Sequence, residues 1–204
     1  MSRAFTLCAD DFAQSAAIGE AILDLLAARR LSATSVFSQA PQLAALPDVD
    51  AGLHFKLTHP LGDITRPLPY WLVASRLRRL PVKQLSDALF ATLAEYRFPA
   101  GRPYLRAPDR LGHPGDSRAK AAILRAACSG FSRRVTDAGY PALMTQWLAA
   151  APDGALLMCH PGGDDADDEI AGARRNEYRY LASARFAEDC ERAGVTLRPF
   201  RSAI

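Results

Sequence analysis

Short apolar runs alternate along the chain with longer segments in which apolar residues recur every three or four positions. Residues 4–9 form a continuous apolar run that stops at two aspartates, as expected of a strand buried on both faces. Ser15 is a favourable N-cap residue, and the apolar positions that follow it recur at helical spacing up to Arg29. The N-terminal segment therefore predicts a buried strand followed by an amphipathic helix.

The same alternation continues to the C-terminus. Further strands are predicted at residues 34–38, 51–57, 104–106, 155–159 and 195–200, and helices at residues 71–80, 82–96, 117–138, 141–150 and 171–193. Repeated βα units favour an α/β fold in which a parallel sheet or barrel is covered by helices. No linker, repeat or low-complexity tract interrupts the chain, so we expect one domain over residues 1–204.

Polar residues stand at the ends of three predicted strands, where active residues gather in such folds. Asp10 and Asp11 follow the first strand. Adjacent residues of a strand point in opposite directions, so one carboxylate can face a metal while the other faces a substrate or water. The alternative is a loop or helix-capping pair.

Two histidines occupy comparable positions. His54 shares a strand face with Lys56 and Thr58, opposite the apolar set, and an imidazole directed into a polar barrel interior suits a divalent metal. His160 follows residues 155–159 and precedes a Pro-Gly-Gly turn, where it could act as a general acid. The alternatives are a hydrogen-bonded core histidine and a loop histidine. The acidic run at residues 164–169 is interpreted as a solvated loop that leads into a helix N-terminus.

Composition excludes several classes of protein. The formal net charge is +3 and the arginines are scattered, which argues against a nucleic-acid partner. No apolar run reaches the ~18 residues that a membrane span requires. Four widely spaced cysteines without a CxxC pair indicate reduced thiols, so we expect a cytoplasmic protein.

Several collinear stretches resemble the ChbG/YdjC-type carbohydrate deacetylase family, including its HpnK-like branch associated with hopanoid biosynthesis. They are LCADDFAQSAAIGEAI, AGLHFKLTHP, YLRAPDRL, LLMCHPGG and RRNEYRYLAS. The resemblance implies a (β/α) barrel-like fold and metal-dependent hydrolysis of the N-acetyl group of a small amino sugar or glycoconjugate. It implies that Asp10 is the catalytic base and His160 the general acid. It also implies that Asp11 and His54 bind the metal, either Mg or Zn.

The chain departs from the family pattern at several places. Ala13 stands where the family usually has glycine, and both a DGHQHVH-like segment and a TNDGF-like strand are missing. The missing histidine would be the third protein ligand. We therefore expect an incomplete or irregular barrel, whose exposed strand edges would favour a homodimer.

Three explanations of this departure stay open. In the first, the protein is a shortened, inactive relative that binds carbohydrate or serves in assembly. In the second, His113 or His59 replaces the missing third metal ligand. The third explanation is that the complete protein contains segments that this sequence omits.

Overall fold

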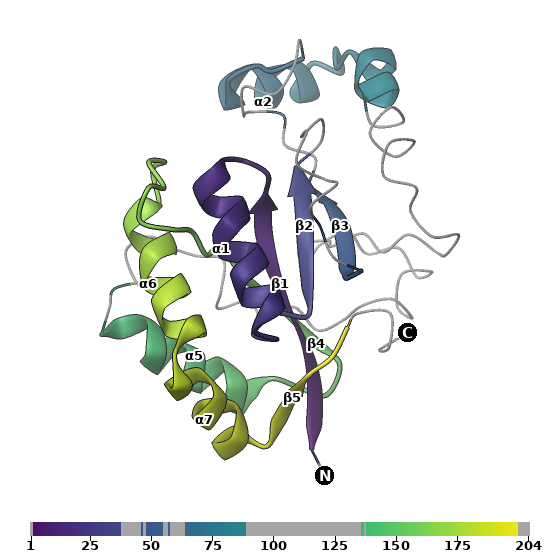
Figure 1. Cartoon of the computed structure of the whole chain (residues 1–204). Coiled ribbons are helices and arrows are strands. Elements are labelled where there is room, and N and C mark those ends of the chain that lie inside the picture. The colour runs from purple at the N-terminus through teal and green to yellow at the C-terminus, as the bar shows by residue number, and fades with distance from the viewer. Residues whose placement is uncertain are drawn as a thin grey trace.

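The structure, a computed structural model, describes residues 2–37, 46, 48–54, 57, 64–88, 136 and 138–199. Its elements in chain order are β1 (Arg3–Phe12), α1 (Ala16–Ala27), β2 (Ala33–Phe37), β3 (Asp50–His54), α2 (Leu68–Arg76), α5 (Gly139–Ala150), β4 (Ala155–Cys159), α6 (Ala171–Ala182), α7 (Ala184–Ala193) and β5 (Val195–Leu197) (Figure 1). Residues 82–88 are also helical.

The strands form one parallel sheet in the order β3-β2-β1-β4, with β5 also paired to β1. Because β4 pairs with Phe5 to Ala9 of β1, both β2 and β5 must use the opposite edge of that strand. On that edge, β2 pairs with the carboxyl-terminal half of β1 and β5 pairs with its amino-terminal half. Strands β2 and β5 therefore lie end to end along β1. All strands therefore run the same way, and their carboxyl ends gather at one end of the sheet.

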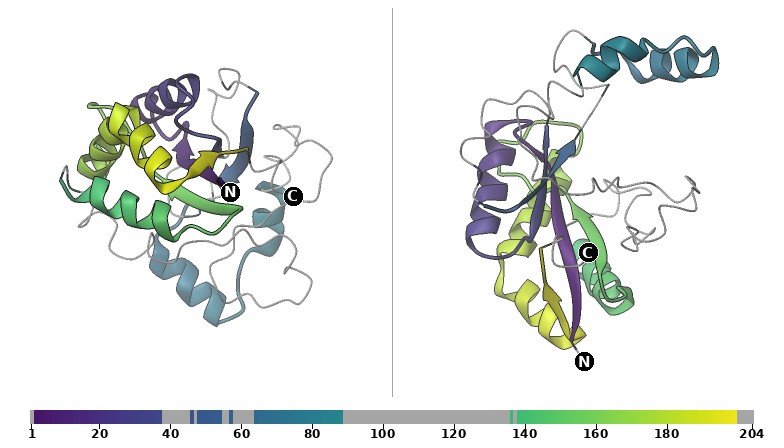
Figure 2. Two further views of the ribbon diagram at one scale, coloured as in Figure 1. Left: turned by 90° about the horizontal axis from the view of Figure 1, so that it is seen from below. Right: turned by 90° about the vertical axis from the view of Figure 1, so that its right-hand side faces the viewer.

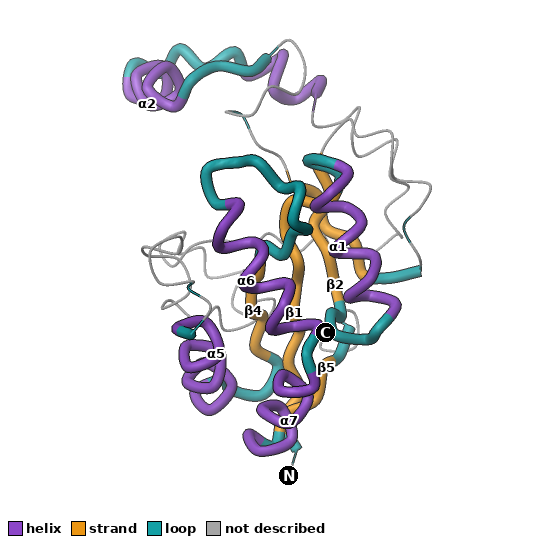
Figure 3. The backbone as a smooth tube through the Cα atoms, turned by 60° about the vertical axis from the view of Figure 1, so that its left-hand side comes forward, coloured by secondary structure: helices purple, strands orange, loops and turns teal. Residues whose placement is uncertain are grey.

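Helices cover one face of this curved sheet. Helix α6 contacts α1, α5 and α7, and α5 also contacts α7, so the four helices form a continuous outer layer. Figure 3 shows α1 and α6 side by side in front of the strands, and Figure 2 shows how the helices wrap around the sheet. The arrangement is the α/β, barrel-like fold predicted from the sequence.

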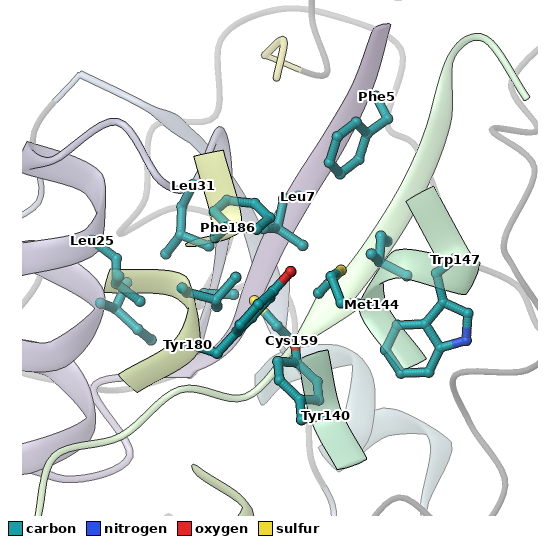
Figure 4. Close-up of a cluster of buried hydrophobic side chains, with 14 of the residues drawn as sticks. Phe5, Leu7, Leu25, Leu31, Tyr140, Met144, Trp147, Cys159, Tyr180 and Phe186 are labelled. Atoms are coloured by element: carbon teal, nitrogen blue, oxygen red, sulfur yellow. The ribbon is translucent and has the colours of Figure 1, made fainter. Parts of the chain in front are cut away.

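An apolar core joins the sheet to the helices. It contains Leu7 and Ala9 of β1, Leu157 of β4, Tyr140 and Met144 of α5, and Phe186 of α7 (Figure 4). Alternation along β1 turns Thr6, Cys8 and Asp10 to the opposite face, which is the interior of the barrel-like fold. The face that carries Asp10 is therefore fixed by burial of its neighbours among the helices.

The helix N-cap predicted at Ser15 is confirmed, because its Oγ accepts a hydrogen bond from the Ile18 backbone N–H over 3.3 Å. The prediction of one helix over residues 171–193 is wrong, because the chain breaks at Ser183 into α6 and α7. Ser183 adopts extended backbone angles, and its Oγ donates to the Tyr180 carbonyl over 2.6 Å. This side chain competes for a backbone acceptor that a continuous helix would use.

The third strand and the following helix differ in their bounds from the prediction. Strand β3 is described over Asp50–His54, and residues 55 and 56 of the predicted strand lie outside the described residues. Helix α2 begins at Leu68 instead of residue 71 and ends at Arg76 instead of residue 80. The predicted strand at residues 104–106 and the predicted helix over residues 117–135 lie outside the described residues. Residues 136 and 138, at the end of that predicted helix, are described and are not helical. Among the helices that the structure does describe, none is long and apolar enough to cross a membrane.

Candidate active site

Four neighbouring strands each deliver polar side chains to the carboxyl end of the sheet. His54 ends β3, Ser35 lies in β2, Asp10 and Asp11 lie near the end of β1, and His160 follows β4. The side chains therefore stand across the sheet in the order of the strands. The three strand ends singled out from the sequence converge on one site.

Asp10 lies in the interior of the fold and is 2% exposed. The Ser35 hydroxyl donates a hydrogen bond of 2.7 Å to its Oδ1 atom. The other oxygen, Oδ2, lies 3.9 Å from Nε2 of His160. Two groups at this separation can both contact one water molecule or one substrate atom at about 2.8 Å.

Asp11 departs from the strand alternation that the sequence predicts. Between Ala9 and Phe12 strand β1 advances three residues while its partner β2 advances two, which is a β-bulge. Asp11 sits in this bulge with φ of 72°. The bulge turns the Asp11 carboxylate toward the same site as Asp10, so the prediction that the two carboxylates diverge is wrong.

His54 is held from three sides. Its Nδ1 atom lies 3.3 Å from Oδ1 of Asp11 and 3.2 Å from the Ser35 hydroxyl, and its ring stacks on Phe37 with centroids 4.9 Å apart. The side chain stays 22% exposed. The imidazole is thus fixed in orientation while part of it remains open to solvent.

The Asp11 and His54 pair fits part of a divalent metal site. Ser35 donates its proton to Asp10, so its oxygen is left to accept from Nδ1 of His54 in the tautomer that carries a proton on this nitrogen. Ligands about 2.1 Å from a tetrahedral zinc ion stand about 3.4 Å apart, close to the 3.3 Å between Nδ1 and Oδ1. A metal ion bound by both atoms would take the place of that proton.

The described residues supply two such ligands. Within them no group of three His, Cys, Asp or Glu side chains is arranged to hold a metal ion. His59 and His113, the two candidates for a replacement ligand, lie outside the described residues.

Arg174 of α6 is a site residue that the sequence analysis missed. It is 1% exposed, and its Nη2 atom lies 2.6 Å from Oδ2 of Asp11 and 2.6 Å from Oδ2 of Asp168. Burial alone would lower the pKa of the guanidinium, but the two carboxylates reverse this and raise it. Burial would likewise raise the pKa of Asp168, but the hydrogen bond and charge of Arg174 hold it below its usual value. The expected solvated loop at residues 164–169 thus turns one carboxylate inward.

Glu177, one turn further along α6, was also missed. It is fully buried, and its Oε2 atom accepts a hydrogen bond from the backbone N–H of His160. Burial raises the pKa of Glu177 to about 8, although the hydrogen bond from His160 and the charge of Arg174 oppose this shift. The Tyr140 hydroxyl faces the same carboxyl group, and burial followed by the charge of Glu177 raises the pKa of Tyr140 well above its usual value.

A signal for these two residues exists in the sequence. Ala173, Arg174, Glu177, Tyr180 and Leu181 are the buried residues of α6, so the two charged residues lie in the apolar stripe of the helix. A charged residue at a core position of a helix is expected to have a buried partner. The pattern predicts such a partner, but it does not say which one.

Comparisons with known proteins agree with this arrangement. The family model described as YdjC-like protein matches residues 4–89, a stretch that includes Asp10, Asp11, Ser35 and His54. The crystal structure of a proposed cellobiose-phosphate cleavage protein from Enterococcus faecalis is similar over 99% of both chains, with a TM-score of 0.60 and 16% sequence identity. No curated protein sequence matches the chain. The family match supports the YdjC-like family, and the similar crystal structure shows the fold.

Proposed function

We propose that the protein is a metal-dependent deacetylase of the YdjC type that hydrolyses the N-acetyl group of an amino sugar or glycoconjugate. The observation that carries the proposal is the convergence of Asp10, Asp11 and His160 with His54 on one site at the strand ends. The family match over residues 4–89 and the fold shared with a proposed carbohydrate-phosphate cleavage protein support it.

In this proposal Asp10 is the general base. Its carboxylate is buried, and the hydrogen bond from Ser35 fixes Oδ1, which leaves Oδ2 directed toward His160. A water molecule between Oδ2 and Nε2 of His160 would lose its proton to Asp10 as it attacks the acetyl carbonyl. His160, in its protonated form, then gives a proton to the nitrogen of the departing amine.

Asp11 and His54 would hold a divalent ion, magnesium or zinc. When bound, such an ion polarises the amide carbonyl and lowers the pKa of a coordinated water molecule. Arg174 binds Oδ2 of Asp11, which orients Oδ1 toward His54. The chain therefore supplies both the ligands and the residue that fixes the direction of the carboxylate.

A non-catalytic carbohydrate-binding or assembly role is the second candidate. It is favoured by the finding that the described residues bring together two of the three protein ligands that a tightly held catalytic metal needs. Divalent metal affinity separates the two candidates, because the enzyme requires a bound ion and the binding protein does not.

Self-association is a further part of the proposal. The large apolar side chains that are exposed in the described part of the chain all lie in residues 68–82, on and after α2. We propose that a second copy of the chain covers this face. Light scattering coupled to size-exclusion chromatography should give twice the monomer mass for the wild type. The Leu72→Asp variant should give the monomer mass. A monomeric wild-type protein would contradict the homodimer.

The proposed activity is tested by release of acetate from N-acetylglucosamine in the presence of zinc or magnesium. We expect acetate release that depends on the added metal and is lost on chelation. Purified protein that releases no acetate from this sugar or from its β-1,4-linked oligomers, under conditions where it binds metal, would contradict the deacetylase proposal.

A further inference from the structure

The turn that carries His160 packs directly against α6. Three hydrogen bonds join them: the His160 N–H donates to Glu177, the His160 carbonyl accepts from Nη1 of Arg174 over 3.4 Å, and the Gly162 N–H donates to the Arg174 carbonyl over 3.2 Å. Both polar groups of the His160 peptide backbone are therefore bound by side chains from one helix.

The two side chains that bind the His160 backbone project from the same face of α6. Arg174 and Glu177 are three residues apart, so they lie on the same face of α6 one turn apart. Both are buried, at 1% and 0% exposure. A buried side chain with fixed partners has one orientation, so the backbone of His160 is held without freedom to shift along the helix.

Close contact between the turn and α6 depends on Gly162. A Cβ atom on this residue would lie 3.0 Å from Cδ and 3.1 Å from Cβ of Arg174. Any larger residue at this position would push the turn away from the Arg174 side chain. Gly162 therefore permits the approach through which Arg174 reaches the His160 carbonyl.

Arg174 also links this turn to the opposite side of the site. The same guanidinium that binds the His160 carbonyl binds Oδ2 of Asp11. The distance between the base Asp10 and the imidazole of His160 thus depends on a helix that contributes no side chain to the reacting atoms.

We propose that Glu177 and Arg174 form a backbone clamp on α6 that positions the imidazole of His160 over Asp10. Glu177 is in this account a positioning residue that acts through His160. The inference rests on the proposed function only for the role of His160 as an acid, since the clamp itself is a feature of the fold.

The protonation state of Glu177 agrees with such a role. Burial raises the pKa of its carboxyl group to about 8, so near neutral pH the group is mostly uncharged. An uncharged carboxyl group still accepts a hydrogen bond from the His160 N–H through its carbonyl oxygen. Glutamine should therefore replace Glu177 with little disturbance, whereas leucine leaves the buried N–H of His160 without an acceptor.

The experiment compares Glu177→Leu with Glu177→Gln by NMR of protein labelled in its histidine rings, with the His160 signals assigned from His160→Ala. We expect Glu177→Leu to shift or broaden the His160 ring signals and to change their titration with pH. Glu177→Gln should leave the His160 signals close to those of the wild type. Asp189→Leu is the matched control, because Asp189 is a buried acid on α7 whose carboxylate accepts a hydrogen bond from the Tyr180 hydroxyl.

Activity gives a second reading of the clamp. If the deacetylase proposal holds, Glu177→Leu should lower kcat for acetate release from N-acetylglucosamine by about 100-fold with little change in KM, because a displacement near 1 Å at a reacting group has this effect. Glu177→Gln should recover most of kcat, and Asp189→Leu should lower it only in proportion to the unfolded fraction.

The outcomes separate the clamp from the proposed function. Unchanged His160 signals in Glu177→Leu would overturn the clamp whatever the activity. Shifted His160 signals in a protein that never releases acetate would support the clamp and contradict the deacetylase. If Glu177→Leu fails to fold, Gly162→Ala tests the same contact, and unchanged His160 signals in that variant would overturn the clamp.

Discussion

Nη2 of Arg174 lies 2.6 Å from Oδ2 of Asp11, although 163 residues separate the two along the chain. This contact ties α6 in the helix layer to the bulge at the end of β1. It also leaves the second oxygen of Asp11, which lies 3.3 Å from His54, directed into the site. A buried guanidinium thus determines how a candidate metal ligand is presented.

Arg174→Met should destabilise the protein strongly. The variant leaves Asp11 buried without its counter-charge, and removal of one partner from a buried ion pair costs about 3–5 kcal/mol. Urea denaturation of both proteins measures the free energy of unfolding. The control is Arg179→Ala on the same helix, whose ion pair with Asp164 is exposed and contributes less than about 1 kcal/mol. Equal losses in the two variants would contradict a buried role for Arg174.

Asp10→Asn should abolish turnover but preserve metal binding. The amide cannot take a proton from water, and removal of a general base lowers the rate about 10²- to 10⁴-fold. Ser35→Ala should have a smaller effect, because it removes the 2.7 Å hydrogen bond that orients Asp10 and the 3.2 Å contact with His54 but keeps the carboxylate that takes the proton. Acetate release and zinc titration measure the two properties separately. Turnover retained in Asp10→Asn would remove Asp10 from the role of base.

The pKa of Glu177 predicts a pH dependence of stability. Its pKa is about 8 in the folded chain against 4.5 for the ordinary carboxyl group. Between these pH values the folded state keeps a proton that the unfolded state has lost, so the free energy of unfolding falls as the pH rises from about 4.5 to about 8. Glu177→Gln removes this titration.

Urea denaturation of the wild type and Glu177→Gln at several pH values in this window measures the difference. Arg174, His160, Tyr140 and Asp10, the other ionisable groups that face Glu177, are present in both proteins, so their titrations cancel to first order. We expect the wild type to lose stability relative to the glutamine variant as the pH rises. A constant difference would show that Glu177 ionises normally.

Ala13→Gly should raise the stability slightly or leave it unchanged. Ala13 has φ of 69°, a conformation that costs a non-glycine residue about 1–2 kcal/mol. The buried methyl group returns about 0.8 kcal/mol. The matched variant Ala187→Gly, within α7, should instead lose about 1 kcal/mol. A loss at Ala13 as large as that at Ala187 would contradict the account of backbone strain.

Much of the site could be predicted because hydrophobic patterns locate strand ends. Buried runs before Asp10 and His160 identify the residues at which β1 and β4 deliver side chains, and parallel strands bring those ends together. These features depend on local sequence alone.

Other features depend on contacts between distant segments. The bulge at Asp11 is visible only in the register with β2, and the partner of Arg174 lies at the opposite end of the chain. The helix break at Ser183 is not marked by a proline or glycine in the sequence. Single-sequence patterns contain periodicity but not register or pairing, so these features required the structure.

Zinc titration calorimetry of the wild type, Asp11→Asn and His54→Ala tests most directly whether the strand ends form a metal site. We predict one ion per chain in the wild type and affinity at least about 100-fold weaker in both variants. Asp189 is a buried acid that contacts Tyr180 and Arg192, so Asp189→Asn should bind zinc as the wild type does. Absence of binding in the wild type, or affinity unchanged in both site variants, would contradict the metal-dependent mechanism.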